Sequence, residues 1–591
     1  MVHRQRLLGC VDFGQLIDIR GIMAQGMTQT RDVYRHFWVL APLVLGLGSV
    51  TMLFGVLPKI MQDEYVYSSQ ARNSPFGEHQ LSNYLFSWVM SSTKLCSGES
   101  FYGCAKAINV LLFLVGIFLV YLIAIRVLDL VWAVVVASIT ALSPLAIQTS
   151  FFMPETMYFM AMMFSVWIAL VASEKGTYWL WGLLGVTLGL TSLVKPHAIF
   201  LLPALMAFTL LIEARRVGDA KKRKLMATLI VAAGFFASKA AVGFAFAGVN
   251  GLRLFGGYES PVDSTGRILR SETLNGQQTF LAGQPTTGFE AFLNVASTHL
   301  FMHAAAMLLL AGIPLLLSLR VLWRILSTRE TIGVASSLML LTSLLALSML
   351  LLVPVFEGYV TSSGQDHSTR LILRYYEFLI PLFVIASFLV PRFVEPSRKS
   401  RFIQATLVAS ASLSFAGIFS SLFTGRYVDS TTLAGFEDAR PILIAISIAI
   451  AISAFVWASN PAIGHFWISV GTIPLLLVTS MFVSQGLLVR TNSNEAYFGF
   501  AGKAANKALE FAPGENIVVV GENRPAVFTA KFWIDKSNIR DLLLVAGSTL
   551  SSDSELIAGV DYLVVFDEIK LSGDFELLQA GEGYRILAKG K

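Results

Sequence analysis

The sequence is poor in cysteine and in charged residues, and each shortage excludes a class of protein. Only 3 of its 591 residues are cysteine, too few for a disulfide-dense scaffold or a multi-cysteine zinc module. Charged residues make up 14% of the chain, whereas a soluble domain usually carries about 25%. The net charge of +6 is spread over the whole length, without the concentrated basic face that binds nucleic acid. We therefore expect neither a soluble protein nor a nucleic-acid partner.

The sequence also lacks motifs that bind soluble nucleotides, and it shows no targeting signal. No glycine-rich phosphate-binding loop occurs in the sequence. No internal repeat or low-complexity linker is evident either. The first apolar run begins only near Phe37 and is long enough to span a bilayer, so we expect no cleavable signal peptide. These absences direct the search for function to chemistry at the membrane.

What is abundant is apolar sequence, with 55% hydrophobic residues and a mean hydropathy of +0.66. A bilayer core of ~30 Å requires about 20 apolar residues per helix. Runs of this kind predict about thirteen membrane helices, although proline interrupts several runs, so one or two could merge or split. The predicted spans are 37–57, 107–125, 131–149, 156–172, 178–194, 197–212, 225–247, 298–318, 332–354, 374–391, 402–423, 441–458 and 464–485.

Basic residues gather in alternate connections between these runs, most densely at 215–224. Such clusters stay on the cytoplasmic side of a membrane, which places the N-terminal tail inside and the long loops 58–106 and 248–297 outside. We therefore expect a multi-pass protein of the plasma (inner) membrane. Cys96 and Cys104 lie in the first outer loop, on the oxidising side, where they either pair or remain two free thiols.

The character of the chain changes after about residue 488. Short alternating or apolar runs are separated there by polar helical stretches, a pattern typical of a small α/β domain. An odd number of spans places this segment outside the membrane as well. The predicted organisation is a cytoplasmic tail (1–36), a transmembrane domain (37–487) with its two long outer loops, and an extracytoplasmic α/β domain (488–591).

The first outer loop carries two adjacent carboxylates close to the bilayer surface, Asp63 and Glu64, followed by Tyr67 and Arg72. On a helix, Asp63, Tyr67 and Arg72 are expected to share roughly one face, while Glu64 is rotated by about 100°. One acidic side chain can then address a cavity while its neighbour is held elsewhere. We expect the chemistry to lie in the outer loops, with Asp63 beside a cavity.

The Asp-Glu pair at the mouth of this loop, trailed by Tyr and Ala-Arg, resembles the signature of the GT-C glycosyltransferases. It is most similar to the polyprenyl-phosphate-sugar-dependent branch, which includes the aminoarabinose transferase acting on lipid A and the protein O-mannosyltransferases. Three further segments are similar: Glu155 after a proline, Lys195 in the sequence Ser-Leu-Val-Lys-Pro-His, and Arg374-Tyr375-Tyr376. The span number and the outer C-terminal domain also match the aminoarabinose branch. The resemblance implies a mainly α, GT-C-like membrane fold and a polyprenyl-phosphate-linked sugar donor.

The chemistry of sugar transfer suggests a role for each of these side chains. An attacking hydroxyl must lose a proton, which a nearby carboxylate can accept, and Asp63 is our candidate base. The departing lipid phosphate needs positive charge near the membrane surface. The predicted catalytic residues are Asp63, Glu64 and Glu155, and the predicted donor-binding residues are Tyr67, Arg72, Lys195, Lys239, Arg374, Tyr375 and Tyr376. Structural roles remain open as alternatives: a helix cap for Asp63, interfacial snorkelling for Lys195, and a membrane-border belt for Arg374 and its tyrosines.

A divalent cation is a further open question. The candidate ligands are Glu64, His79, Glu155 and His197, but lone histidines are more often hydrogen-bonded structural residues. Zinc usually requires three or four well-placed ligands, and no such cluster is legible in the sequence. The metal dependence is therefore left undecided.

We predict an enzyme that moves one sugar from a polyprenyl-phosphate carrier to a lipid, glycan or protein acceptor at the outer face. One candidate base and no evident protein nucleophile favour inversion of the anomeric centre. The alternative is a transporter or flippase of lipid-linked sugars, which would place charges near the bilayer midplane and often show paired repeats. The acidic residues instead gather at one surface. A polysaccharide polymerase or ligase would share the location and the donor.

Overall fold

The architecture comes from a computed structural model of the chain. The tail 1–36 and most of the loop 248–297 lie outside the described residues, so the expectations for both segments stay predictions. The residues that the structure describes are 37–53, 60, 62–79, 81–96, 100–216, 220–254, 289–328, 332–362, 370–389, 396–417, 429–493, 495–512, 516–537, 539–545 and 547–590.

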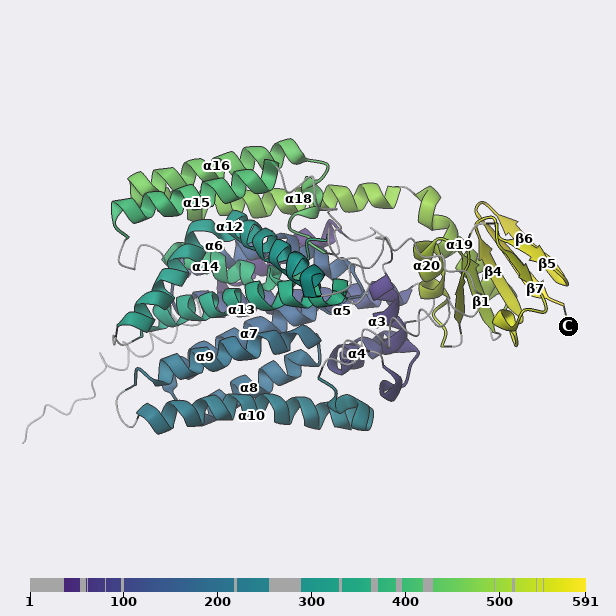
Figure 1. Cartoon of the computed structure of the whole chain (residues 1–591), viewed down its shortest axis with the longest axis horizontal. Helices are drawn as coiled ribbons and strands as arrows, with labels where there is room; N and C mark the ends of the chain where they lie inside the picture. The colour runs from purple at the N-terminus through teal and green to yellow at the C-terminus, as the bar shows by residue number, and fades with distance from the viewer. Residues whose placement is uncertain are drawn as a thin grey trace, which may run out of the picture.

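Most of the chain forms a bundle of long helices, and a small sheet-containing domain lies at one end of it (Figure 1). The first half of the bundle comprises α2 (Leu40–Thr51), α5 (Ser100–Ala124), α6 (Leu130–Ala141), α7 (Glu155–Lys175), α8 (Tyr178–Ser192), α9 (Leu202–Glu213) and α10 (Ala220–Ala247). The second half comprises α12 (Phe289–Ser327), α13 (Val334–Ser362), α14 (Ile380–Leu389), α15 (Arg398–Gly417), α16 (Arg440–Ser459), α17 (Pro461–Phe466) and α18 (Ile473–Ser493).

Within the described part of the chain, eight helices are long and apolar enough to cross a membrane, or nine if the bent pair of α6 and the 3-10 helix η4 (Pro144–Ser150) counts as one span. Each of the thirteen predicted runs overlaps a helix. Several of these helices, including α2 and α14, are shorter than a bilayer requires. The chain is a multi-pass membrane protein, and the number thirteen stays a prediction.

Small residues allow two of the membrane helices to pack backbone against backbone. Gly182, Gly185 and Gly189 lie on the face of α8 that contacts α10. A Cβ atom at Gly185 would overlap the carbonyl oxygen of Val231, and one at Gly189 would overlap Ser238. Small residues at such spacing are how membrane helices approach closely, because van der Waals contact must replace the hydrophobic effect there.

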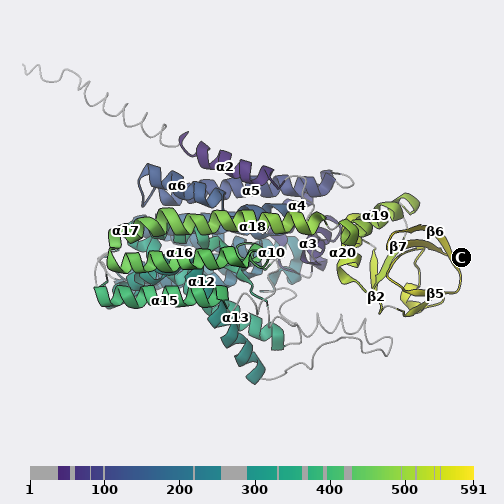
Figure 2. The same ribbon diagram turned by 90° about the horizontal axis from the view of Figure 1, so that it is seen from above.

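Two short helices, α3 (Gln62–Arg72) and α4 (Tyr84–Ser91), lie between the bundle and the C-terminal domain in both views (Figures 1 and 2). Cys96 and Cys104 form a disulfide beside them. The described part of the first outer loop is thus helical and cross-linked, although its composition is polar. Helix α3 is the element that carries the predicted carboxylates.

The C-terminal domain is the predicted α/β unit. Helices α19 (Glu495–Phe511) and α20 (Arg524–Ile534) accompany a five-stranded sheet of order β2-β1-β4-β7-β6. Strand β1 pairs in parallel with β2 and β4, whereas β7 is antiparallel to β4 and β6. All five residues of β1 are buried, as expected of a parallel strand covered on both faces. The strands are β1 (Ile517–Gly521), β2 (Arg540–Leu543), β3 (Thr549–Ser551), β4 (Tyr562–Phe566), β5 (Lys570–Ser572), β6 (Phe575–Gly581) and β7 (Tyr584–Lys589), of which β3 and β5 form a separate parallel pair.

This domain docks onto the bundle through α20. Phe532 and Trp533 contact the rings of Phe101 and Tyr102 at the start of α5, with centroid distances of 5.2 to 6.0 Å. Lys531 lies 4.6 Å from the ring of Tyr65 on α3. The domain is thus in direct contact with the helix that carries Asp63.

Candidate active site

Asp63 lies in the first turn of α3 and reaches across to a residue more than 300 positions away. Its Oδ2 atom accepts hydrogen bonds from Nη1 and Nη2 of Arg374, at 3.2 and 3.3 Å. The Asp63 side chain is 45% exposed, whereas Arg374 is only 10% exposed. One carboxylate oxygen therefore faces the arginine, and the half-exposed group keeps access to its surroundings.

Behind this pair lies a second, buried ion pair. Lys195 Nζ donates to Oε1 of Glu155 at 2.8 Å, and both side chains are almost fully buried. Nη1 of Arg374 lies 3.9 Å from the same oxygen. The structure thus joins Asp63, Arg374, Glu155 and Lys195, four predicted site residues, into one cluster of alternating charge. Pairing of this kind offsets the cost of burying each charge.

The four residues come from four different elements. Asp63 begins α3, Glu155 begins α7 directly after Pro154, Lys195 precedes the 3-10 helix η5 (Pro196–Leu201), and Arg374 lies in the 3-10 turn η8 (Leu373–Tyr375). Pro154 is the N-cap residue of α7 and Pro196 is the first residue of η5, positions where the missing N–H of proline breaks no helical hydrogen bond. The chain breaks therefore supply the polar groups at one end of the bundle.

Aromatic rings surround the lysine. Its Nζ lies 4.7 Å from the ring centroid of Tyr375 and 5.5 Å from that of Tyr158, distances at which a cation is attracted to a ring face. The imidazole of His197 stacks on Tyr375 with a centroid separation of 4.3 Å. Tyr375 and His197 thus belong to the cluster, and they restrict the positions that the ammonium group can adopt.

The Arg374 turn is held by residues that no sequence motif marks. The backbone N–H of Arg374 donates to the Asp429 carbonyl at 2.8 Å, and the Asp429 carboxylate accepts from Nε and Nη2 of Arg370 at 2.9 and 2.6 Å. Burial lowers the pKa of Arg370, but the hydrogen bond and charge of Asp429 outweigh that effect and raise it. Arg370 therefore stays charged beside the site.

A buried carboxylate closes the other side of the same turn. Glu377 accepts hydrogen bonds from Gln148 Nε2 at 2.9 Å, from Thr431 Oγ1 at 2.8 Å, and from N and Oγ1 of Thr432 at 3.0 and 2.9 Å. Four donors satisfy a carboxylate without a paired cation. Glu377 thereby fixes the start of α14, and with it the Arg374 turn, against residues 431–432 and η4.

Glu64 points away from Asp63, as the helical geometry predicts. It is fully buried and accepts a hydrogen bond from the backbone N–H of Phe152 at 2.8 Å. The Tyr102 hydroxyl lies 3.3 Å from the same carboxylate oxygen and donates to the Ser150 carbonyl at 2.6 Å. Glu64 therefore ties α3 to the connection that leads into Glu155. Its predicted catalytic role stays untested.

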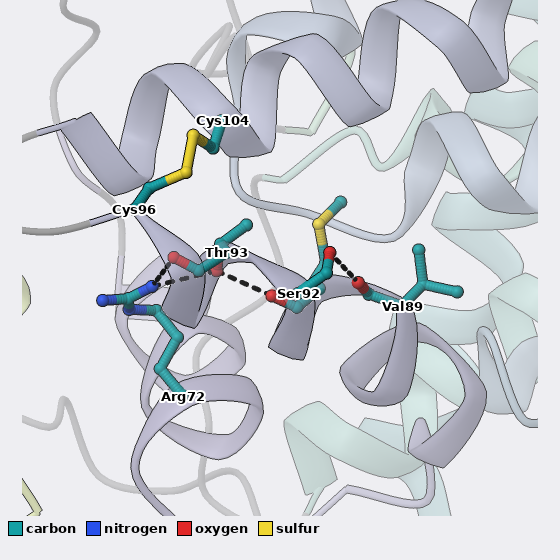
Figure 3. Close-up of a disulfide and its surroundings, with 7 residues drawn as sticks. Arg72, Val89, Ser92, Thr93, Cys96 and Cys104 are labelled. Atoms are coloured by element: carbon teal, nitrogen blue, oxygen red, sulfur yellow. Dashed lines mark hydrogen bonds between the residues drawn. A yellow bond between two sulfur atoms is a disulfide. The ribbon is translucent and has the colours of Figure 1, made fainter.

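The prediction that Arg72 shares a helix face with Asp63 is wrong. The nine-residue step from Asp63 to Arg72 turns the helix by about 900°, or two and a half turns, and rises by about 13.5 Å. Arg72 therefore projects from the side of α3 opposite to Asp63. Arg72 donates instead to Oδ2 of Asp535 at 2.8 and 2.6 Å and to the side chain and carbonyl of Thr93. Figure 3 shows its guanidinium directed at Thr93, near the Cys96–Cys104 disulfide.

Three other predicted donor-binding residues have surroundings of their own. Tyr67 is buried against Phe86 with a centroid distance of 5.6 Å. The Tyr376 hydroxyl donates to the Met349 carbonyl at 3.1 Å, toward α13. Lys239 is buried within α10. These contacts of Tyr67 and Tyr376 lie outside the Asp63–Arg374 cluster, so a direct donor contact for the three residues stays a prediction.

The candidate metal ligands do not converge. Within the described ranges, no three His, Cys, Asp or Glu side chains gather in a way that would hold a metal ion. His79 stacks near Tyr84, with centroids 5.9 Å apart, and its Nε2 lies 3.4 Å from the Ser74 carbonyl. His197 and Glu155 engage Tyr375 and Lys195, respectively. The expected cavity beside Asp63 stays a prediction, because the flanking segments 54–59 and 363–369 lie outside the described residues.

Comparison with known proteins gives one match to a family and several distant structural similarities. Residues 84–240 match the model of the dolichyl-phosphate-mannose-protein mannosyltransferase family, about a quarter of the chain. The match confirms the predicted resemblance over these residues, which include Glu155, Lys195 and His197. No curated protein matches the chain.

Among solved structures, ArnT from Cupriavidus metallidurans bound to undecaprenyl phosphate is 14% identical with a TM-score of 0.49, and the alignment covers 94% of this chain and 98% of that one. The Archaeoglobus fulgidus oligosaccharyltransferase in its apo form is 13% identical with a TM-score of 0.45, covering 90% of this chain and 70% of that one. These values are too low to support an argument about function.

Proposed function

We propose that this chain is a membrane glycosyltransferase that moves one sugar from a polyprenyl-phosphate donor to an acceptor hydroxyl at the outer face. The observation that carries the proposal is the cluster of Asp63, Arg374, Glu155 and Lys195 at one end of the helical bundle. The family match over residues 84–240 supports a lipid-phosphate-linked donor.

In this mechanism Asp63 is the general base. The acceptor oxygen attacks the anomeric carbon, the bond from that carbon to the phosphate oxygen breaks, and the hydroxyl proton passes to Asp63. The leaving group departs as polyprenyl phosphate with the electron pair of the broken bond. A single displacement inverts the anomeric centre. The half-exposed Asp63 carboxylate suits this role, because a base must reach the proton that it accepts.

Arg374 is the natural partner of the leaving phosphate. It binds Asp63 at 3.2 Å, and a bound phosphate would compete for the same guanidinium N–H groups. Donor binding would thereby exchange the Asp63–Arg374 contact for a phosphate–Arg374 contact and release Asp63 for the acceptor. Lys195 lies one layer deeper on Glu155, so its positive charge supports the site electrostatically.

Two observations support an outer location. The Cys96–Cys104 disulfide lies beside α3, and disulfides persist on the oxidising side of a membrane. The basic segment 215–224 joins α9 to α10, at the end of α9 that is farther from Lys195. Clusters of basic residues stay on the cytoplasmic side of a membrane.

The test is transfer by the purified full-length protein in liposomes, using radiolabelled polyprenyl-phosphate sugars and candidate acceptors. Asp63→Asn is expected to fold and bind donor but to lose ~10²-fold or more in transfer rate, the scale of general-base catalysis. Glu78→Gln, which changes an exposed acid in the same loop, is the matched control. Undiminished transfer by Asp63→Asn would remove this residue from the mechanism. Movement of the donor between leaflets without any transfer would instead identify a flippase.

A further inference from the structure

A cavity with several arginines in its wall lies at the opposite end of α7 from Glu155. It encloses about 410 Å³, and its wall includes three arginines, Arg215, Arg216 and Arg223, together with Glu174 and Ser337. The arginines come from the end of α9 and the start of α10, and Ser337 comes from the first turn of α13. The volume is within the ~300–1,000 Å³ typical of ligand sites.

The three guanidinium groups are fixed in place by backbone carbonyls at helix ends. Arg215 Nη2 donates to the carbonyls of Ile325 and Thr328, near the end of α12. The Nη2 groups of Arg216 and Arg223 donate to the carbonyls of Ser173 and Gly176, respectively, near the end of α7. Each arginine has five N–H donors, so these bonds orient the groups without exhausting them.

Among the residues that the structure describes, the positive charge of this wall exceeds the negative charge that faces it. Glu213 is fully buried and forms ion pairs with Arg216 Nε at 3.1 Å and Arg223 Nε at 2.6 Å. One carboxylate thus balances the charge of only one of these two arginines. Glu174 is paired with Arg126 at 2.8 Å. Arg215 bonds only to carbonyls, and its Nε is buried with no hydrogen-bond partner in the described part of the chain.

The described residues give Arg215 no carboxylate partner, so an anionic oxygen in the cavity would balance its charge. Gly333 and Val334 at the start of α13 also line the cavity, and the N–H groups of the first residues of a helix have no partner within it. Helix starts favour phosphate through these donors. Arginine forks, a helix start and excess positive charge thus converge on one cavity.

We propose that this cavity binds a phosphate group, namely the phosphodiester of an anionic phospholipid in the cytoplasmic leaflet. The basic segment 215–224 predicts that this end of the bundle lies at the cytoplasmic surface, where anionic lipids are concentrated. The site is independent of the sugar-transfer cluster at the other end of α7.

The test is lipid binding to the purified full-length protein in detergent, measured by native mass spectrometry and by the midpoint of thermal unfolding. Phosphatidylglycerol is compared with phosphatidylcholine and with inorganic phosphate. Arg215→Gln is the informative variant, because Arg216 and Arg223 neutralise the buried Glu213 and their loss would damage the fold. Arg398→Gln, an exposed arginine of α15, is the matched control.

We expect phosphatidylglycerol to bind the parent and Arg398→Gln, with affinity reduced at least ~10-fold in Arg215→Gln, the scale of one charge-assisted hydrogen bond. Inorganic phosphate producing the same Arg215-dependent shift would support the site with a free anion as its source. Equal binding by parent and Arg215→Gln, or no preference over phosphatidylcholine, would overturn the proposal.

A second variant keeps the test decisive if Arg215→Gln fails to fold. Val334→Asp places a carboxylate in the cavity wall at the first residue of α13, where an acidic side chain stabilises a helix. Its charge should repel a phosphate and lower phosphatidylglycerol binding, whereas Val334→Asn should not. Identical binding by these two variants would exclude an anion from the cavity.

Discussion

The contact between Arg72 and Asp535 should determine how firmly the C-terminal domain holds α3. Asp535 accepts two hydrogen bonds from Arg72 at 2.6 and 2.8 Å and one from Asn73 at 2.9 Å. The paired side chains are only 8% and 16% exposed. We predict that Asp535→Asn lowers the free energy of opening this interface by about 2 kcal/mol, the range for a charged hydrogen bond.

The choice of asparagine follows from the backbone. Asp535 has φ 49°, in the left-handed region that asparagine tolerates better than alanine. Substitution by alanine would add backbone strain to the loss of the ion pair and would confuse the two effects. The expected loss is smaller than the ~3–5 kcal/mol of a fully broken buried pair, because Arg72 retains Thr93 and the ring of Phe101, 4.3 Å away.

The assay is amide hydrogen exchange by mass spectrometry on the full-length protein. A loss of about 2 kcal/mol corresponds to about 30-fold faster exchange through local opening. This acceleration should appear in peptides covering α3 and α20, and Glu555→Gln, an exposed acid of the same domain, should leave these peptides unchanged. Arg72→Gln and the double variant complete a cycle whose coupling energy isolates the pair. Unaltered exchange in α3 would refute the reasoning that this ion pair anchors the helix.

Three other contacts can be tested by stability and binding measurements. Replacing Cys96 and Cys104 by serine should cost about 2.5 kcal/mol, as expected for a cross-link closing so short a loop, and reductant should then no longer alter the thermal midpoint. Lys195→Met should weaken donor binding and also destabilise the protein, because Glu155 is left buried and unpaired. Adding Glu155→Gln should restore the stability of the protein but not its affinity for the donor. Full recovery of donor affinity in this double variant would contradict a donor role for Lys195. Burial lowers the pKa of His79, so the unfolded chain takes up this proton first and stability should fall as the pH drops from about 7 to 5; His79→Gln should flatten that dependence in thermal unfolding scans.

The sequence was sufficient for the features that depend on local composition. Apolar runs of about 20 residues located the membrane helices. Short apolar runs after residue 488 indicated the α/β domain, because a strand that is covered on both faces must be apolar throughout. The different directions of Asp63 and Glu64, about 100° apart, followed from helical geometry alone. The resemblance to a family nominated Arg374, Lys195 and Glu155.

Long-range partners were beyond the reach of the sequence. Glu377 bonds to Thr431 and Gln148, the latter 229 positions away, and no local pattern distinguishes it from an interfacial acid. Asp429 follows a polar stretch with no motif, yet it holds Arg370 and the Arg374 backbone. The wrong face expected for Arg72 could have been avoided from the sequence, because nine helical residues make two and a half turns. Its partner Asp535, 463 positions away, could not have been predicted. Such contacts depend on how distant segments fold together.

Helix α7 has an acidic residue at each end, Glu155 at its start and Glu174 near its finish. Nineteen residues of α-helix measure about 28 Å, close to the ~30 Å thickness of a bilayer's hydrocarbon core. Each acid is also paired with a cation, so neither end can sink into the lipid without taking an ion pair with it. A thicker or thinner bilayer must therefore adapt its own thickness to the protein or change the tilt of the whole bundle.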